Sequence, residues 1–299
     1  MLPTSQALTP KQIEDFHKNG FIGPFTMCTP EEMGEYRRNI EEEIFSETPV
    51  PEFSMKTGRD RHLDSPAVYD LITHPVPKSY LTQLLGAELQ IWRSSFFVKP
   101  PGSPATVWHQ TNVFKEFVDE PILEPPDPES LFQLTTWIAI DESTVENGCV
   151  QLLPGSHNTF KVKGIVDQVT KESRAKEATS YGLKDQGFFG YDIKFDTKVD
   201  PDKVVNMQCK PGQFFIFTQR LLHGSPPNNS QKRRLGVAFR TIQSNVKAYA
   251  HFLPAGKIEH YGFTFDLTKW GCALLGGDNA LKLNPIAERP VVKRPLSNL

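Results

Sequence analysis

His109 and His223 are the residues of this sequence best suited to binding a metal ion. His109 lies in the stretch VWHQTNVF, and His223 follows the apolar run GQFFIFTQRLL and precedes the turn-forming run GSPPNNS. Strands far apart in a chain become neighbours in a two-sheet β domain, so the two imidazoles can converge on one ion. The alternative is that each histidine is a hydrogen-bonded residue at the end of a strand, and spacing alone leaves both interpretations open.

The second feature is a missing carboxylate. In a common type of iron site, two histidines act together with an aspartate or glutamate, which is usually found two residues after the first histidine. Thr111 occupies that position here, and neither neighbour, Gln110 or Asn112, is acidic. A metal held by His109 and His223 alone would therefore keep a further position open to a small ligand from solution.

An arginine in the strand-like run RRLGVAFR adds a binding group for an anion. Arg240 comes seventeen residues after His223. Its guanidinium can bind a carboxylate through two parallel hydrogen bonds, which suits a dicarboxylate cosubstrate. The competing interpretations are a surface salt bridge for Arg240, and Arg234 as the anchor in its place. Three apolar residues alternate with Arg240 and lie on the opposite face of the strand: Leu235, Val237 and Phe239.

The elements that must position these residues are predicted from the pattern of apolar residues. Residues 1–87 are interpreted as helical, because the Thr-Pro pairs at 9–10 and 29–30 are typical helix starts. From about residue 88 to 250, short apolar or alternating runs rich in Phe, Val, Ile and Thr are separated by Gly and Pro, which is typical of strands.

These elements predict one mainly β domain over residues 1–299. Its core is expected to be a jelly roll, a cupin-like double-stranded β-helix, with N-terminal and flanking helices. The polar stretch 160–205 is interpreted as a lid insertion, in which Phe188, Phe189 and Tyr191 would close over the site. Residues 251–299 form a C-terminal segment that ends in a Pro-rich, basic extended arm.

Composition excludes several classes of protein. The chain has 299 residues and a formal net charge of −2, so no basic field favours nucleic acid. No apolar run approaches the ~18 residues of a membrane span. The first residues, MLPTSQALTPKQ, show neither the basic nor the apolar region of a signal peptide, so a cytoplasmic location is expected. The four cysteines form no CxxC pair and are interpreted as reduced core residues.

Motifs along nearly the whole chain resemble a known family, the syringomycin-type non-haem iron, 2-oxoglutarate-dependent aliphatic halogenases of the phytanoyl-CoA dioxygenase superfamily. The run ENGCVQLLPGSH marks the superfamily, whereas GFFGYD and EHYGFTFDLTKWG are closer to the halogenase branch. In chain order the resemblance is carried by FHKNGFIGPF, RDRHLD, WRSSFFVKPPG, WHQ, TTWIAIDESTVENGCVQLLPGSHN, GFFGYD, KPGQFFIFTQRLLHGS, RLGVAFR and IEHYGFTFDLTKWG.

The resemblance implies the cofactors and the residues that bind them. Iron(II), 2-oxoglutarate, chloride and O2 are expected, with His109 and His223 as the iron ligands. Arg240 would hold the distal carboxylate of 2-oxoglutarate, and Trp137 and Thr106 would belong to the same cosubstrate pocket.

It also implies a halide site at the position of the missing carboxylate. These halogenases have alanine or glycine where this chain has Thr111, and the vacancy lets chloride bind the iron. Thr135 matches a threonine near the halide, and Phe114 matches a phenylalanine that lines the halide pocket. With the substrate nearer the halide than the oxygen-derived ligand, chlorine rather than hydroxyl is transferred to carbon.

The sequence departs from the halogenase pattern at four positions. Thr111 is larger than alanine or glycine and brings a hydroxyl, which can hydrogen-bond chloride or hold a water on the metal. Asn112 stands where the pattern has an acid, Ser95 replaces a glutamate, and Gln219 replaces a small hydroxyl residue near the halide. Changes around a metal alter ligand orientation and affinity.

The sequence therefore presents four alternative functions. The first is a halogenase, and the second is a hydroxylase of the same family in which water or Thr111 completes the iron shell. The third is a non-catalytic family member, and the fourth is a cupin-like small-molecule binder with unrelated histidines. The in-order match argues against the fourth, and the retained histidines and arginine argue against the third.

The resemblance also implies a partner. Halogenases of this type act on aminoacyl groups that phosphopantetheine tethers to a carrier protein in non-ribosomal peptide assembly; a free amino acid or another small metabolite is the alternative. Carrier domains are usually acidic, so the short basic runs at 161–163 and 231–234 are candidates for a docking rim. The sequence does not specify the substrate, the carbon attacked or the oligomeric state.

Overall fold

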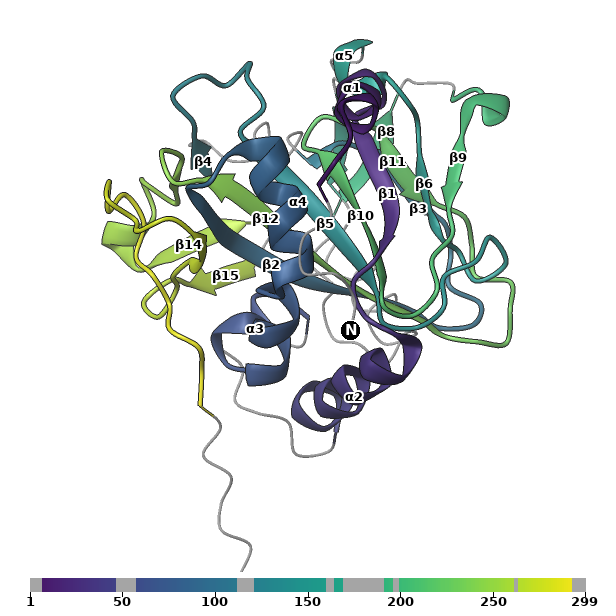
Figure 1. The fold of residues 1–299 in the computed structure, drawn as a ribbon, viewed down its shortest axis with the longest axis horizontal. Helices are drawn as coiled ribbons and strands as arrows, with labels where there is room; N and C mark the ends of the chain where they lie inside the picture. The colour runs from purple at the N-terminus through teal and green to yellow at the C-terminus, as the bar shows by residue number, and fades with distance from the viewer. Residues whose placement is uncertain are drawn as a thin grey trace, which may run out of the picture.

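Two antiparallel sheets form the centre of the protein in a computed structural model (Figure 1), which describes residues 7–46, 58–111, 121–159, 164–168, 191–195, 199–260 and 263–291. The larger sheet has the strand order β1-β10-β5-β12-β2-β16, and the smaller has the order β3-β11-β6-β9. The larger sheet comprises β1 (Phe21–Thr26), β2 (Leu89–Lys99), β5 (Gln133–Ala139), β10 (Gln213–Thr218), β12 (Arg234–Gln243) and β16 (Ala273–Gly276). The smaller comprises β3 (Thr106–His109), β6 (Val150–Leu152), β9 (Val205–Met207) and β11 (His223–Ser225).

Three two-stranded pairs complete the β structure. They are β4 (Leu123–Glu124) with β13 (Lys247–Ala248), β7 (Gly164–Gln168) with β8 (Tyr191–Phe195), and β14 (Lys257–His260) with β15 (Phe263–Asp266). The α-helices are α1 (Pro10–Asn19), α2 (Pro30–Ile40), α3 (Pro66–Ile72), α4 (Pro75–Leu85) and α5 (Ser156–Thr159). None of the helices in the described ranges has both the length and the apolar content needed to cross a membrane.

The helix boundaries follow from local capping. The side chains of Thr9 and Thr29 each accept a hydrogen bond from the backbone N–H three residues later. The side chains of Gln12 and Glu32 in turn accept from the backbone N–H groups of Thr9 and Thr29. Such reciprocal capping satisfies two backbone donors that a helix start leaves free. Gly20 ends α1 with φ 83°, a left-handed conformation that favours glycine.

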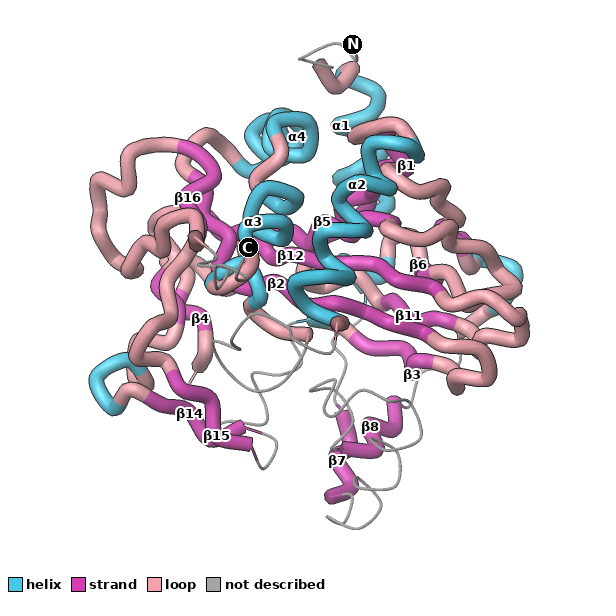
Figure 2. The backbone as a smooth tube through the Cα atoms, turned by 90° about the horizontal axis from the view of Figure 1, so that it is seen from below, coloured by secondary structure: helices cyan, strands magenta, loops and turns pink. Residues whose placement is uncertain are grey.

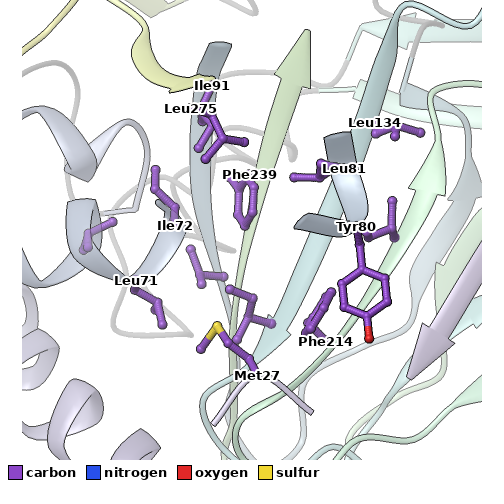
Figure 3. Packing of buried hydrophobic residues seen from close by; sticks show 14 of the residues in the cluster. Met27, Leu71, Ile72, Tyr80, Leu81, Ile91, Leu134, Phe214, Phe239 and Leu275 are labelled. Carbon is purple, nitrogen blue, oxygen red and sulfur yellow. The ribbon is translucent and has the colours of Figure 1, made fainter. Parts of the chain in front are cut away.

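One face of the larger sheet is covered by helices. Figure 3 shows Phe239 of β12 between Ile72 of α3 and Leu81 of α4, and Figure 1 shows these helices in front of the sheet. Leu235 and Val237 belong to the same buried cluster. Because side chains alternate along a strand, the other face of β12 carries Arg234, Gly236, Ala238 and Arg240.

That other face packs against the smaller sheet, whose strands β6, β11 and β3 lie side by side in Figure 2. Trp137 and Ala238 of the larger sheet share a buried cluster with Leu152 of β6 and Met207 of β9. Arg234 and Arg240 therefore lie on the inner face, between the two sheets. The alternation in the sequence left this question open.

The main expectations for the fold are confirmed, with exceptions. The protein is mainly antiparallel β with flanking helices, whereas its classification as a jelly roll stays a prediction. Residues 1–87 are not purely helical, because β1 lies among them and pairs with β10. The C-terminal segment contributes β16 to the larger sheet. Most of the expected lid, with Phe188 and Phe189, and the last residues of the expected arm lie outside the described residues.

Candidate metal centre

His109 and His223 are brought together by the pairing of β3 with β11. They are direct cross-strand partners, and their ring centroids lie 4.2 Å apart. Two nitrogens that each lie ~2 Å from a shared ion require rings at about this separation. The expected convergence of the two histidines is therefore seen in the structure.

A backbone hydrogen bond selects the tautomer of His223. Its Nδ1 lies 2.8 Å from the carbonyl oxygen of Leu221. A carbonyl only accepts, so Nδ1 carries the proton and Nε2 presents a lone pair. Burial holds the pKa of His223 well below its usual 6.5, and nearby His109 and Arg240 lower it further. The ring is therefore held neutral, which is the form that binds a metal.

Position 111 is fixed close to this pair. The Thr111 N–H donates to the carbonyl of Gln219 at 3.1 Å, and the Gln110 side chain donates to the carbonyl of Arg220. These bonds join the chain just after His109 to the chain just before His223. Within the described residues, no group of three His, Cys, Asp or Glu side chains is arranged to hold a metal ion. None of the described acidic side chains therefore joins the two histidines in such a group.

Arg234 belongs to a group of cationic and hydroxyl-bearing residues that lies near the histidines. Its guanidinium carbon lies 5.6 Å from the centroid of the Trp137 ring, and its Nη1 donates to the Gly148 carbonyl at 2.6 Å. A Cβ at Gly236 would lie 2.2 Å from the Trp137 indole, so only glycine lets that ring lie across β12. The Nε of Arg234 is buried without a hydrogen-bond partner.

Lys99 adds a second cation to this group. Its Nζ donates to the Ser225 hydroxyl at 2.7 Å, and that hydroxyl donates to Thr106 Oγ1 at 3.0 Å. Burial, and then the charge of Arg234, lower the pKa of Lys99 to about 7. Neither cation forms an ion pair with a described acidic residue. The group Arg234–Lys99–Ser225–Thr106 is therefore suited to binding an anion.

Arg240 lies in a second cationic group on the same inner face. Its cross-strand partners are Arg93 on β2 and Thr135 on β5. Burial, and then the charges of Arg93 and Arg59, lower the pKa of Arg240 to about 9. The described contacts thus link the predicted cosubstrate residues Trp137 and Thr106 to the group of Arg234 and Lys99, whereas Arg240 pairs with Arg93 and Thr135.

The remaining expected site residues lie around the histidines where they are described. Thr135 is also the cross-strand partner of Phe217, whose ring centroid lies 4.8 Å from that of His223. The Oγ1 of Thr135 is buried without a hydrogen-bond partner. Gln219 donates to the Ser130 carbonyl at 3.1 Å, but its Oε1 has no partner. Phe114 lies outside the described residues.

The geometry agrees with a family match that covers most of the sequence. The profile of the phytanoyl-CoA dioxygenase family matches residues 16–236, which include both histidines and Arg234. The chain belongs to the phytanoyl-CoA dioxygenase family. Among curated members, the dioxygenase lolE1 of Epichloe uncinata is 26% identical over 190 residues, which cover 62% of this chain and 60% of lolE1. The dioxygenase trt7 of Aspergillus terreus is 22% identical over 256 residues, which cover 81% of this chain and 77% of trt7.

A solved structure extends this family relation over nearly the full chain. CytC3, solved with Fe(II) and alpha-ketoglutarate, is 26% identical with a TM-score of 0.69, and the match covers 94% of this chain and 93% of CytC3. The halogenase-type subdivision expected from the motifs is finer than the family match and stays a prediction.

Lys99, Ser225, Arg93 and Arg59 were missed by the sequence reasoning. A signal was present for Arg93 and Lys99, because each is a cation in the strand-like run WRSSFFVK and the two positions share one face of that strand. Ser225 and Arg59 carried no such signal, since their roles come from neighbours distant in sequence.

Proposed function

We propose that this protein is an iron(II)- and 2-oxoglutarate-dependent halogenase that chlorinates an unactivated C–H bond of an amino acid, either free or held as an aminoacyl group. The observation that carries the proposal is that His109 and His223 converge, with His223 held neutral, and that a threonine stands two residues after His109, where a metal-binding carboxylate is usual. Family membership and the similarity to CytC3 support the cofactors.

The donor set fits iron(II). His223 presents Nε2 because its Nδ1–H donates to Leu221, and His109 lies beside it. When bound there with 2-oxoglutarate and O2, iron(II) supplies the oxidising power to remove a hydrogen atom from an unactivated C–H bond. The protein holds the cofactors and the substrate and excludes water.

The distal carboxylate of 2-oxoglutarate is assigned to Arg234 rather than to Arg240. Arg234 lies against Trp137 and close to Lys99, whose hydrogen-bond chain reaches Thr106. Thr106 and Ser225 lie on the histidine strands, two or three residues from His109 and His223, which is ~7–10 Å along a strand. That length suits a five-carbon dicarboxylate between the histidines and the cations.

Chloride is proposed to take the position that the missing carboxylate leaves open. Thr135 Oγ1 is a buried hydroxyl without a partner, beside the Phe217 ring that packs on His223. A buried donor without a partner costs ~1–3 kcal/mol. An anion or an ordered water within its reach would remove that cost.

An anaerobic titration tests this function directly. We expect iron(II) and 2-oxoglutarate to give a metal-to-ligand absorption band, and chloride to shift it. The same band without dependence on chloride would identify a hydroxylase, and the absence of any band would contradict an iron and 2-oxoglutarate enzyme. His223→Ala serves as the matched variant, because it removes one proposed ligand and should remove the band.

Hydroxylation is the second candidate function. Its support is the buried Gln219 Oε1, which has no hydrogen-bond partner and lies on the residue whose carbonyl accepts the Thr111 N–H. With the Thr111 hydroxyl, this oxygen could hold a water where a halide would otherwise bind. Product analysis in the presence and absence of chloride separates the two candidates.

Cosubstrate affinity is expected to depend on pH through Lys99. Its pKa of about 7 means that it is protonated below neutrality and loses its charge as the pH rises. Both carboxylates of 2-oxoglutarate stay ionised throughout, so binding favours the protonated lysine. We expect the Kd for 2-oxoglutarate to rise roughly tenfold between about pH 6 and about pH 8.5. Lys99→Gln should flatten this dependence, and an unchanged slope in that variant would show that another group titrates.

Two forms of the substrate are compatible with this proposal: an aminoacyl thioester on a carrier protein, and the free amino acid. Of the basic run 231–234, expected as part of a docking rim, Arg234 is buried, and Arg233 pairs with Asp141 at 2.9 Å and Glu41 at 2.5 Å. The run 161–163 lies outside the described residues. The two forms differ in charge, because the thioester is neutral and the free acid carries a carboxylate.

A further inference from the structure

Three arginines gather on the inner face of the larger sheet, near the histidine pair. Arg93 on β2 and Arg240 on β12 are direct cross-strand partners. Arg59 joins them through Tyr249, whose hydroxyl accepts hydrogen bonds from Arg59 at 3.0 Å and from Arg93 at 2.5 Å. This group, Arg59–Arg93–Arg240–Tyr249, is named the arginine cluster.

Within the arginine cluster, neither Arg93 nor Arg240 forms an ion pair with a described acidic residue. Asp60 is the acidic residue that contacts it, with Oδ2 3.5 Å from Arg59 Nε and Oδ1 accepting from the Ser94 N–H. Arg240 forms no hydrogen bond or ion pair with a described residue, and the Nε atoms of Arg93 and Arg240 are buried without partners. Arg93 and Arg240 are only 9% and 6% exposed.

Such an arrangement is costly unless an anion completes it. Like charges directly opposite each other on neighbouring strands destabilise a sheet, and burial adds the loss of hydration. The cost is visible in the pKa of Arg240, which burial and the two neighbouring arginines lower to about 9. Packing on the Trp92 ring, 4.2 Å from the Arg93 guanidinium, offsets part of it for Arg93 but not for Arg240.

The cluster is held rigidly in place. Asp60 adopts φ 55°, its N–H donates to the Ser94 carbonyl at 2.8 Å, and Arg59 forms a backbone bridge with Ser95. The segment carrying Arg59 is therefore fixed along β2. Rigid placement favours recognition of a specific group, because little side-chain freedom is lost on binding.

The arginine cluster also lies near the metal centre, away from the group Arg234–Lys99–Ser225–Thr106 that is proposed to bind 2-oxoglutarate. Arg240 and Thr135 are cross-strand partners, and so are Thr135 and Phe217. The Phe217 ring centroid lies 4.8 Å from that of His223, which places Arg240 close to the histidine pair. Arg234 pairs with Lys99 at one end of β12, and Arg240 pairs with Arg93 six residues further along the strand. An anion bound at Arg240 is thus separate from the distal carboxylate of 2-oxoglutarate and near the reacting position.

We propose that the arginine cluster binds the carboxylate of the substrate, so that this enzyme acts on a free L-amino acid and not on a carrier-bound aminoacyl thioester. This inference rests on the proposed function. Arg240 and Arg93 offer guanidinium donors to the two oxygens of one carboxylate, and the aliphatic part of the amino acid extends toward the histidines. A thioester carbonyl has no charge to pair with Arg93 and Arg240 and would leave these two arginines without an anion.

The test uses the holoprotein with iron(II), 2-oxoglutarate, chloride and O2. The probes are the proteinogenic L-amino acids, each compared with its own primary amide, and the readout is the rate of succinate formation. We expect at least one acid to accelerate succinate formation, its amide to be inert, and the product to be chlorinated. The inference is overturned if no acid accelerates the reaction, if acid and amide act equally, or if only a carrier-bound thioester does.

A charge variant on the inner face sharpens the test. Ser95 lies two residues from Arg93 on the same face, and its cross-strand partner is Ala238. Ser95→Glu places a carboxylate beside the cluster and should raise the KM for the acid about 100-fold by competing for the arginines. Ser95→Gln is the matched control of similar size without charge, and its KM should change by less than about threefold. Equal effects of the two variants would indicate crowding and would overturn the electrostatic argument.

A second variant separates the cluster from the cosubstrate site. Arg240→Gln should raise the KM for the acid about 100-fold while the iron and 2-oxoglutarate absorption band forms at an unchanged Kd. Loss of the band in this variant would mean that Arg240 holds the cosubstrate, and the inference would fall. Failure of the band in the unaltered protein would instead contradict the proposed function.

Discussion

Thr111→Asp is expected to abolish chlorination while leaving the protein folded. The backbone at position 111 is fixed by its bond to the Gln219 carbonyl, which the substitution keeps. A carboxylate two residues after His109 completes the usual set of two histidines and one acid, and so takes the position proposed for chloride. We expect chlorinated product to fall at least about 100-fold, as a change in metal ligation allows. The chloride-dependent shift of the absorption band should disappear.

Two smaller substitutions at the same position serve as controls. Thr111→Ala removes both the hydroxyl and the methyl and should keep or increase chlorination. Thr111→Val removes the hydroxyl but keeps the volume. A loss shared by the Val and Ala variants would assign the hydroxyl a role in holding the halide, whereas a loss confined to the Val variant would indicate crowding of the halide. Product ratios measured by mass spectrometry compare the three variants. Continued chlorination by Thr111→Asp would refute the account of an open position.

Local features of the fold were predictable because their causes are local. Thr9, Pro10 and Gly20 define α1 through capping and backbone conformation, and the structure begins and ends the helix where they predict. β1 was not predicted, because its run FIGPFT contains Gly-Pro and is held by pairing with β10, almost two hundred residues away. Strand pairs over such separations leave little trace in a single segment.

The candidate site was predictable in part for the same reason. The convergence of His109 and His223 could be anticipated from their places at strand ends. Arg234 and Arg240 could not be distinguished by alternation, since an even separation puts both on one face of β12. Their roles are separated by neighbours from other elements: Trp137 and Lys99 for Arg234, and Arg93 for Arg240. The cationic groups therefore became visible only in the assembled sheets.

Arg234→Gln is expected to weaken binding of 2-oxoglutarate about 100-fold to 1000-fold. Arg234 is buried beside Trp137, and no described acidic residue neutralises it, so the dianion would be its main partner. Removing one member of a buried charge pair costs about 2–5 kcal/mol, or about 30-fold to 4000-fold in affinity, and the expected loss lies within that range. Glutamine is chosen because its amide N–H can still donate to the Gly148 carbonyl, the bond that Arg234 forms at 2.6 Å. The Kd is measured by anaerobic titration of the absorption band.

The comparison with Arg240→Gln decides between the two arginines. Both residues are buried cations on one face of β12, so both variants remove the same charge and carry similar risk to the fold. Thermal unfolding measured on each variant corrects for any difference in stability. If Arg240→Gln weakens cosubstrate binding and Arg234→Gln does not, Arg240 is the anchor, as the family resemblance alone implied. The opposite result leaves the arginine cluster available for the substrate, because one guanidinium between Trp137 and Lys99 then accounts for the distal carboxylate.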